Sequence, residues 1–173
     1  MSQSSSQNPL EISPPSIESA HPSNYAPDIL GEGYEQLVLN LADDDQGKVI
    51  ATLIRKKAKQ HTTKAVLYIH GFLDYFFQKE LAEQFNQQGY DFYALDLRKY
   101  GRSYLPHQQM FYVRHLNEYD AEITEALKII VQENHDAVIL SGHSTGGLIT
   151  TLYAAHHPEN TFIKALWVNS PFY

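Results

Sequence analysis

Short apolar runs separated by polar connections predict an alternation of strands and helices along most of the chain. Residues 34–41 alternate in part between apolar and polar side chains, and residues 48–55 return after a polar turn, which is typical of an antiparallel hairpin. Four later runs are too short and too rich in β-branched or aromatic residues for helices, so they predict buried strands. These runs are residues 64–69, 90–95, 137–140 and 162–169.

Helical spacing fills the intervals between these strands. Apolar residues recur every fourth position through residues 76–88, and Gly89 follows as a stop signal. The same spacing returns over residues 119–131 with an acidic first turn, and residues 147–155 form a third helical stretch. Because strands then alternate with helices, we expect an α/β fold with a mostly parallel sheet and helices on both faces. In such sheets ligands bind beyond the carboxyl ends of the strands.

The first 30 residues differ from the rest of the chain. They are polar at the start and proline-rich after that, so we expect a flexible tail over residues 1–30. Residues 31–173 have the length of one domain, and the 43% hydrophobic content of the chain is sufficient for one core.

The charge and composition of the chain exclude several classes of binding partner and several kinds of chemistry. The formal net charge is −7 and no basic block occurs, which argues against nucleic acid or an anionic membrane. The chain has no cysteine, and hence no disulfide, thiol nucleophile or cysteine-bound metal. It also lacks a secretory signal and an apolar run long enough to span a membrane. We therefore expect a cytoplasmic protein, and its oligomeric state stays open.

Two clusters of metal-ligating residue types occur, and neither predicts a metal site. The acidic triplet at residues 43–45 is typical of a solvated turn between the first two strands. His156 and His157 are adjacent on a helix, and adjacent helical positions do not face one ligand site. We expect these histidines to satisfy a helix end.

The strongest chemical signal is the sequence Gly142-His143-Ser144-Thr145-Gly146, which joins a predicted strand to a predicted helix. In that context G-x-S-x-G indicates a nucleophile elbow. A serine on so tight a turn is strained and has its hydroxyl lifted clear of the sheet, while the glycines have no Cβ to clash. The helix that follows directs its N-terminal N–H groups at the same point, which suits a developing oxyanion. A plain glycine-rich turn remains an alternative, and so does a phosphate-binding loop, although the lysine of that motif is absent.

Two further stretches follow predicted strands: His70-Gly71-Phe72 after the third, and residues 96–103 after the fourth. Together with the elbow after the fifth strand, they resemble the α/β-hydrolase superfamily. The resemblance is greatest to its monoglyceride-lipase and lysophospholipase-like branch, often labelled serine aminopeptidase S33, and covers roughly residue 34 to the end. It implies the α/β-hydrolase fold and the hydrolysis of small-molecule carboxylic esters without a cofactor, with acylglycerol or lysophospholipid-like esters as the expected substrates.

The resemblance also implies roles for individual residues. Ser144 would be the nucleophile that forms an acyl-enzyme. The main-chain N–H groups of Phe72 and Thr145 would form the oxyanion hole. We expect Asp96 and Arg98 to organise their loop rather than take part in the chemistry.

Several neighbours of these groups are expected to support the site. His70 would shape its loop through structural hydrogen bonds, and His143 would point away from the nucleophile. The supporting residues are His70, Gly71, Gly142, His143 and Gly146.

The chain departs from the family pattern after its sixth predicted strand. In the family the triad acid follows the sixth or seventh strand and the histidine base follows the eighth, whereas this chain has Asn169-Ser170-Pro171. The resemblance therefore implies an N-terminal part of an α/β-hydrolase domain, with the C-terminal strands, lid and helices missing. We expect these 173 residues alone to be inactive, and the sixth strand to remain as an uncovered apolar edge.

Other functions are compatible with the same fold. A non-catalytic α/β-hydrolase-fold protein would bind a ligand or partner, although the intact elbow argues against it. An amide or peptide hydrolase, or a lyase, would use the same serine on a different bond. A dehalogenase is disfavoured, because that reaction uses an aspartate where Ser144 stands.

Overall fold

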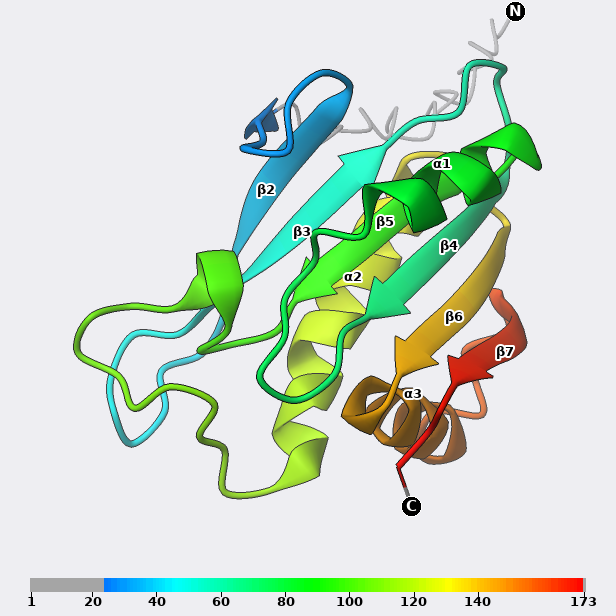
Figure 1. The fold of residues 1–173 in the computed structure, drawn as a ribbon. Coiled ribbons are helices and arrows are strands. Elements are labelled where there is room, and N and C mark those ends of the chain that lie inside the picture. The colour runs from blue at the N-terminus through cyan, green and yellow to red at the C-terminus, as the bar shows by residue number, and fades with distance from the viewer. Residues whose placement is uncertain (1–23, 173) are drawn as a thin grey trace, which may run out of the picture.

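Seven strands form one mixed sheet in the order β1-β2-β3-β5-β4-β6-β7 (Figure 1). The computed structural model describes residues 24–172. The pairs β5–β4, β4–β6 and β6–β7 are parallel, whereas β1–β2, β2–β3 and β3–β5 are antiparallel. The strands are β1 (Ala26–Pro27), β2 (Tyr34–Asn40), β3 (Ile50–Lys56), β4 (Lys64–Ile69), β5 (Asp91–Asp96), β6 (Ala137–His143) and β7 (Ile163–Asn169).

Helices cover both faces of the sheet, as the alternation of elements predicts (Figure 1). Along β4, Leu67 and Ile69 face the core formed with α2 and α3, whereas Val66 and Tyr68 face the core formed with α1. Within residues 24–172, no helix has the length and apolar character needed to cross a membrane. The helices are α1 (Lys79–Gln87), α2 (Asp120–Gln132) and α3 (Thr145–His156), and the 3-10 turns are Gly101–Ser103 and Leu116–Tyr119.

The helix predicted over residues 76–88 begins later than expected, at Lys79. The main chain of Phe76 is engaged elsewhere, because its N–H donates to Asp96 at 2.8 Å and its carbonyl accepts from Arg102 at 3.0 Å. The Phe76 ring is buried, whereas Phe77, which the four-residue spacing placed on the apolar helix face, is exposed. Long-range contacts thus hold the loop after β4 in a non-helical form.

Residues 24–30, the last part of the predicted tail, lie against the sheet. Ala26–Pro27 pair with β2, and the Tyr25 hydroxyl donates to Glu133 at 2.8 Å. Asp28 is buried and forms a two-pronged ion pair with Arg102. This segment has no hydrophobic periodicity, so its attachment depends on contacts with distant residues. The rest of the predicted tail, residues 1–23, lies outside the described residues.

At the other end of the sheet, β7 has apolar side chains exposed on both faces. Leu166 and Trp167 are adjacent, so they point to opposite faces, and each is 43% exposed. The Trp167 ring meets Phe85 edge-on at 5.4 Å between ring centroids. Among the residues that the structure describes, this edge of the sheet is therefore uncovered.

Candidate active site

The turn between β6 and α3 places Ser144 at the carboxyl edge of the parallel strands. Ser144 has φ 52° and ψ −121°, and for a residue with a side chain such a conformation costs on the order of 1–3 kcal/mol. Its N–H donates to the Asn169 carbonyl at 3.0 Å, and its own carbonyl accepts from Gly147 at 2.9 Å and from Phe172 at 3.1 Å. These main-chain bonds hold the strained serine in place.

Glycines allow the elbow to approach the loop after β4. β4 and β6 are neighbours, with Ile69 opposite Gly142. A Cβ on Gly142 would overlap the carbonyl of Gly146, and a Cβ on Gly146 would overlap the carbonyl oxygen of Ile69. A Cβ on Gly71 would lie 3.2 Å from the Cβ of Ser144. The two loops therefore meet backbone to backbone beside the serine.

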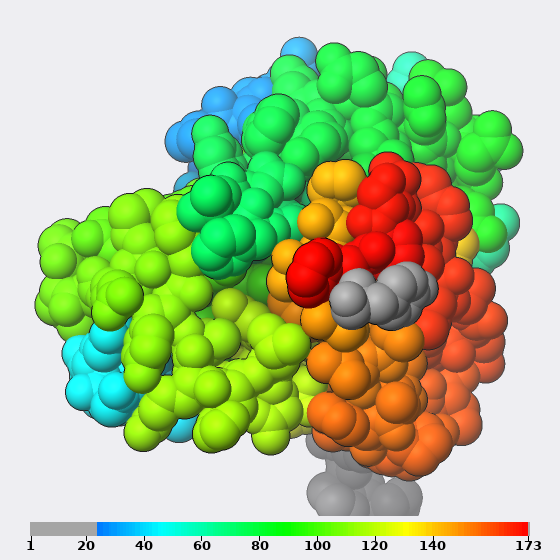
Figure 2. All heavy atoms as spheres, turned by 60° about the horizontal axis from the view of Figure 1, so that its bottom comes forward, coloured from blue at the N-terminus to red at the C-terminus, as the bar shows by residue number. Residues whose placement is uncertain are grey.

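Two main-chain N–H groups next to the serine are available to a ligand. Thr145 is the first residue of α3, so its N–H has no helical carbonyl to receive it. Phe72 follows Gly71, on which an added Cβ would lie 3.2 Å from the Cβ of Ser144. Within residues 24–172, neither N–H donates to a main-chain carbonyl. Figure 2 shows a hollow in this region, bordered by the loop after β4, the stretch before α2, and the elbow. Such N–H groups are the donors that stabilise an oxyanion.

The His70 ring is buried, and both of its nitrogens are engaged. The Leu97 N–H donates to Nε2 at 3.1 Å, which leaves Nδ1 as the protonated nitrogen, and Nδ1 donates to the Gly71 carbonyl at 2.8 Å. Burial lowers the pKa of the His70 ring below its ordinary value, so the ring is neutral. The ring holds its loop in shape and has no free nitrogen for Ser144.

Two ion pairs organise the loop after β5. Arg98 donates to the buried carboxylate of Glu122 on α2, with Nη2 and Oε2 2.6 Å apart. Asp96 accepts the N–H groups of Phe76 and Arg102, and it also pairs with the Arg102 guanidinium at 2.9 Å. Asp96 and Arg98 therefore order the loop, in agreement with the structural roles expected for them.

A third carboxylate in this group, Asp28, had not been singled out from the sequence. Its Oδ2 and Oδ1 accept from Nε and Nη2 of Arg102 at 2.7 and 2.9 Å. The two residues are 74 positions apart, and no local pattern links them. The sequence therefore contains no signal from which this pair could have been predicted.

His143 lies in the elbow itself, whereas His156 and His157 lie at the far end of α3. The His143 ring lies beside Gly71, with Cδ2 3.5 Å from the place that a Cβ would occupy on that glycine. His156 Nδ1 and His157 Nε2 lie 3.1 and 3.4 Å from the Asp120 carboxylate on α2, so within the described residues these rings contact an acidic side chain rather than the terminal carbonyls of α3, contrary to expectation. In the part of the chain that the structure describes, no group of three or more His, Asp or Glu side chains could hold a metal ion.

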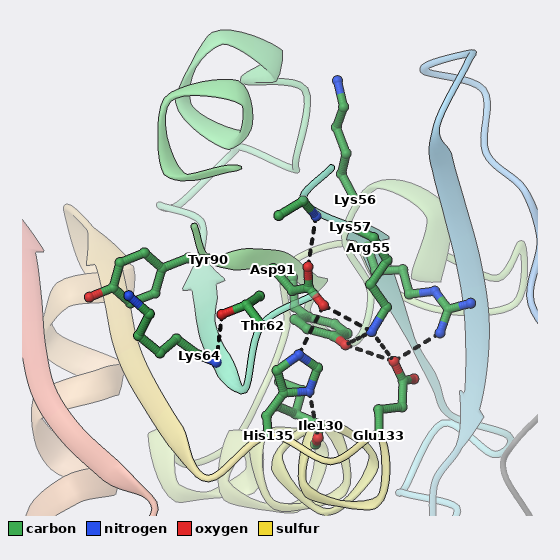
Figure 3. A network of polar contacts seen from close by, with 12 residues as sticks. Arg55, Lys56, Lys57, Thr62, Lys64, Tyr90, Asp91, Ile130, Glu133 and His135 are labelled. Carbon is green, nitrogen blue, oxygen red and sulfur yellow. Dashed lines mark hydrogen bonds and ion pairs between the residues drawn. The ribbon is translucent and has the colours of Figure 1, made fainter. Parts of the chain in front are cut away.

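A second polar cluster lies at the opposite, amino edge of the parallel strands (Figure 3). His135 contacts Asp91 through Nε2 at 2.9 Å and the Ile130 carbonyl through Nδ1 at 2.9 Å. Asp91 also accepts the N–H of Ala58 at 2.7 Å and pairs with Lys57 at 3.2 Å. These groups satisfy one another and join α2, β5 and the connection before β4, which indicates a role in stability.

Known proteins similar to this chain are hydrolases. The family model described as serine aminopeptidase, S33, matches residues 60–173. The mouse protein named epoxide hydrolase 4 is 31% identical over 107 residues, which are 61% of this chain and 28% of that protein. A probable hydrolytic enzyme of Pseudomonas aeruginosa and a monoglyceride lipase of Saccharomyces cerevisiae each have a TM-score of 0.63 to this chain, at 20% and 21% identity. Both alignments cover 79% of this chain, and they cover 42% and 44% of those two chains.

The matched region contains all three stretches on which the site is built. The loop at His70-Gly71-Phe72, residues 96–103 and the elbow at residues 142–146 lie within residues 60–173, which are more than half of the chain. The solved structures show the same fold, although this chain spans less than half the length of those two proteins. The chain belongs to the serine aminopeptidase S33 family of α/β-hydrolases.

Proposed function

We propose that Ser144 is the nucleophile of a serine hydrolase that cleaves carboxylic esters. The observation that carries this proposal is the strained turn at Ser144, together with the N–H groups of Phe72 and Thr145, which donate to no main-chain carbonyl within residues 24–172. Attack by Oγ on an ester carbonyl forms a tetrahedral oxyanion, which those two N–H groups stabilise. The alcohol then leaves, and water hydrolyses the acyl-enzyme. Loss of one such donor typically costs about 3 kcal/mol of transition-state stabilisation.

A serine nucleophile also distinguishes ester hydrolysis from epoxide hydrolysis, the reaction for which the mouse relative is named. Attack of a serine oxygen on an epoxide carbon would leave an ether on the enzyme. An ether has no carbonyl that water can attack, so the enzyme would not be regenerated. Attack on an ester gives an acyl-enzyme that water readily hydrolyses. Ser144 therefore favours an ester substrate over an epoxide.

The surroundings of the site favour an apolar acyl group. Exposed large apolar side chains occur in the loop after β4, in the stretch before α2 and after β7, all of which border the hollow in Figure 2. The basic side chains of the loop after β5, Arg98, Lys99 and Arg102, are paired with carboxylates, and the net charge of the chain is −7, so a neutral lipid-like ester fits better than a polyanion. The monoglyceride lipase among the similar structures supports this substrate class. The exposed large apolar residues of these three segments are Phe72, Leu73, Tyr75, Phe77, Met110, Leu116 and Phe172.

We propose further that polypeptide outside these 173 residues contributes the general base and its acid partner. Both ring nitrogens of His70 are hydrogen-bonded, to Gly71 and Leu97. Both ring nitrogens of His135 are likewise hydrogen-bonded, to Asp91 and Ile130. Residues 31–173 would then be the N-terminal part of the catalytic domain. Loss of triad members lowers kcat by roughly 10⁴- to 10⁶-fold, so the 173 residues alone should be nearly inert.

The test measures p-nitrophenyl ester hydrolysis by an extended chain, meaning these 173 residues together with the polypeptide that supplies base and acid. Medium-chain esters are expected to be cleaved, and Ser144→Ala is expected to abolish cleavage. The matching p-nitroanilides distinguish ester from amide hydrolysis. Ester turnover that persists in Ser144→Ala would overturn the proposal, and faster cleavage of the anilides would assign the amide bond instead.

A further inference from the structure

The loop that carries Phe72 is fastened at both ends. Its first anchor is the buried His70 ring described above. Its second anchor is Phe76, whose N–H donates to Asp96 at 2.8 Å and whose carbonyl accepts from Nη1 of Arg102 at 3.0 Å. Only a few residues separate the anchors, so the second one also limits where the N–H of Phe72 points.

Arg102 donates to the Phe76 carbonyl, and Asp28 determines the orientation of the Arg102 guanidinium. Asp28 occupies Nε and Nη2 of the guanidinium at 2.7 and 2.9 Å, which leaves Nη1 for Asp96 and for the Phe76 carbonyl. The Asp28 side chain is fully buried and that of Arg102 is 8% exposed, so water competes little for these bonds. Burial alone would lower the pKa of Arg102, but the Asp28 and Asp96 carboxylates outweigh it and raise that pKa.

Asp28 is itself held rigidly. It lies in the turn between β1 and β2, where its N–H donates to the Tyr34 carbonyl at 3.0 Å and its Oδ1 accepts the Leu30 N–H at 2.9 Å. On the other side of Arg102, a Cβ on Gly101 would lie 2.5 Å from the Cβ of Tyr75. The loops after β4 and β5 are therefore in close contact. A shift of the Arg102 guanidinium would displace the loop after β4, to which it is hydrogen-bonded through the Phe76 carbonyl.

We propose that Asp28 is a positioning residue for the oxyanion hole, acting through Arg102 and Phe76 on the N–H of Phe72. This role rests on the proposed function, in which that N–H stabilises the oxyanion. Asp28 lies before residue 60, where the match to the family model begins, so the N-terminal segment adds this support to the site region that the model matches.

The decisive variant is Asp28→Asn, which keeps the side-chain shape and the acceptor for Leu30 but loses the charge and one acceptor for Arg102. In the extended chain we expect kcat to fall about tenfold with KM changed less than about twofold, because a misplaced donor weakens transition-state binding only. Asp28→Glu restores the carboxylate and should recover part of the loss. In the 173-residue chain, amide exchange at residues 72–77 should become faster in Asp28→Asn.

Glu35→Gln is the matched control, because it removes a carboxylate–arginine contact of 2.8 Å between β2 and β3 that does not touch the loop. It should leave kcat and the exchange of residues 72–77 unchanged. If Asp28→Asn has the same kcat and the same amide exchange as the wild type, the proposed role of Asp28 is wrong. An equal loss of kcat in Glu35→Gln would also overturn that role. Neither result would affect Ser144-dependent hydrolysis. If hydrolysis does not depend on Ser144, the proposed function fails and the role of Asp28 fails with it.

Discussion

The main-chain N–H of Leu97 donates to Nε2 of His70 over 3.1 Å, and this contact determines which ring nitrogen carries the proton. With Nε2 as an acceptor, Nδ1 must be protonated, and it donates to the carbonyl of Gly71. A histidine directly before the oxyanion loop is therefore a structural link between the loops after β4 and β5.

We predict that the His70 ring stays neutral and Nδ1-protonated as the pH falls below the ordinary histidine pKa of 6.5. Since its pKa is lower in the folded state, the unfolded chain takes up this proton first. The contribution of His70 to stability is then complete above that pH and declines as the pH falls below it. Nitrogen NMR of the ring reports the tautomer directly. A ring protonated on Nε2 alone would contradict the hydrogen bond from Leu97.

A methyl group at the elbow glycines should unfold the chain or displace the elbow. Gly142→Ala and Gly146→Ala place Cβ onto carbonyl oxygens of neighbouring backbone, so we expect each to cost about 3 kcal/mol or more. Gly89→Ala is the control. Its φ of 78° is strained for alanine but nothing lies within 4 Å, so its expected cost is about 1 kcal/mol. Urea unfolding of the three variants measures this, and equal costs would refute the steric argument.

The network around Asp91 predicts a loss of stability in acid. Burial alone would raise the pKa of Asp91, but hydrogen bonds from His135 and Ala58 and the charge of Lys57 outweigh it and lower that pKa. The stabilisation is therefore present above the ordinary value of 3.8 and is lost as the pH falls through the lower, folded-state value.

Asp91→Asn tests this network. Because it leaves buried donors without their charged partner, it should cost roughly 3 kcal/mol at neutral pH, and the difference from wild type should shrink in strong acid. Denaturant titrations at several pH values measure the difference. A cost that does not change with pH would show that the Asp91 charge contributes nothing.

The open edge at β7 should make the 173-residue chain associate with itself. Leu166 and Trp167 expose apolar surface on both faces of a strand whose outer edge is unpaired within the described residues. Light scattering after size exclusion should show a mass that rises with concentration, and Leu166→Lys should reduce it. A monomer at every concentration would contradict this expectation.

Hydrophobic spacing predicted the elements from β2 to β7. Most of these elements place side chains in a core on one or both faces, whereas β7 has an apolar run whose side chains are largely exposed in the described residues. It could not predict β1, whose two residues are exposed and are held by pairing with β2. It also began α1 too early, since the main chain of Phe76 is engaged by Asp96 and Arg102 rather than by the helix. Both differences arise from partners that are distant in the sequence.

In the candidate site, too, features set by local sequence could be predicted and features set by distant partners could not. Gly142, Ser144 and Gly146 could be singled out because one local turn determines all three. The link from Asp28 to Arg102 could not, because the fold alone brings its two residues together. Beyond the family resemblance, the sequence carried no local signal for the substrate, since the exposed apolar side chains near the site come from several separate segments.

The reaction of the extended chain with a fluorophosphonate, followed by peptide mass spectrometry, tests directly whether Ser144 is the nucleophile. We expect one adduct, on the peptide that contains Ser144, and no adduct after Ser144→Ala. An unmodified Ser144 in the folded extended chain, or an adduct that survives the Ser144→Ala substitution, would contradict that role.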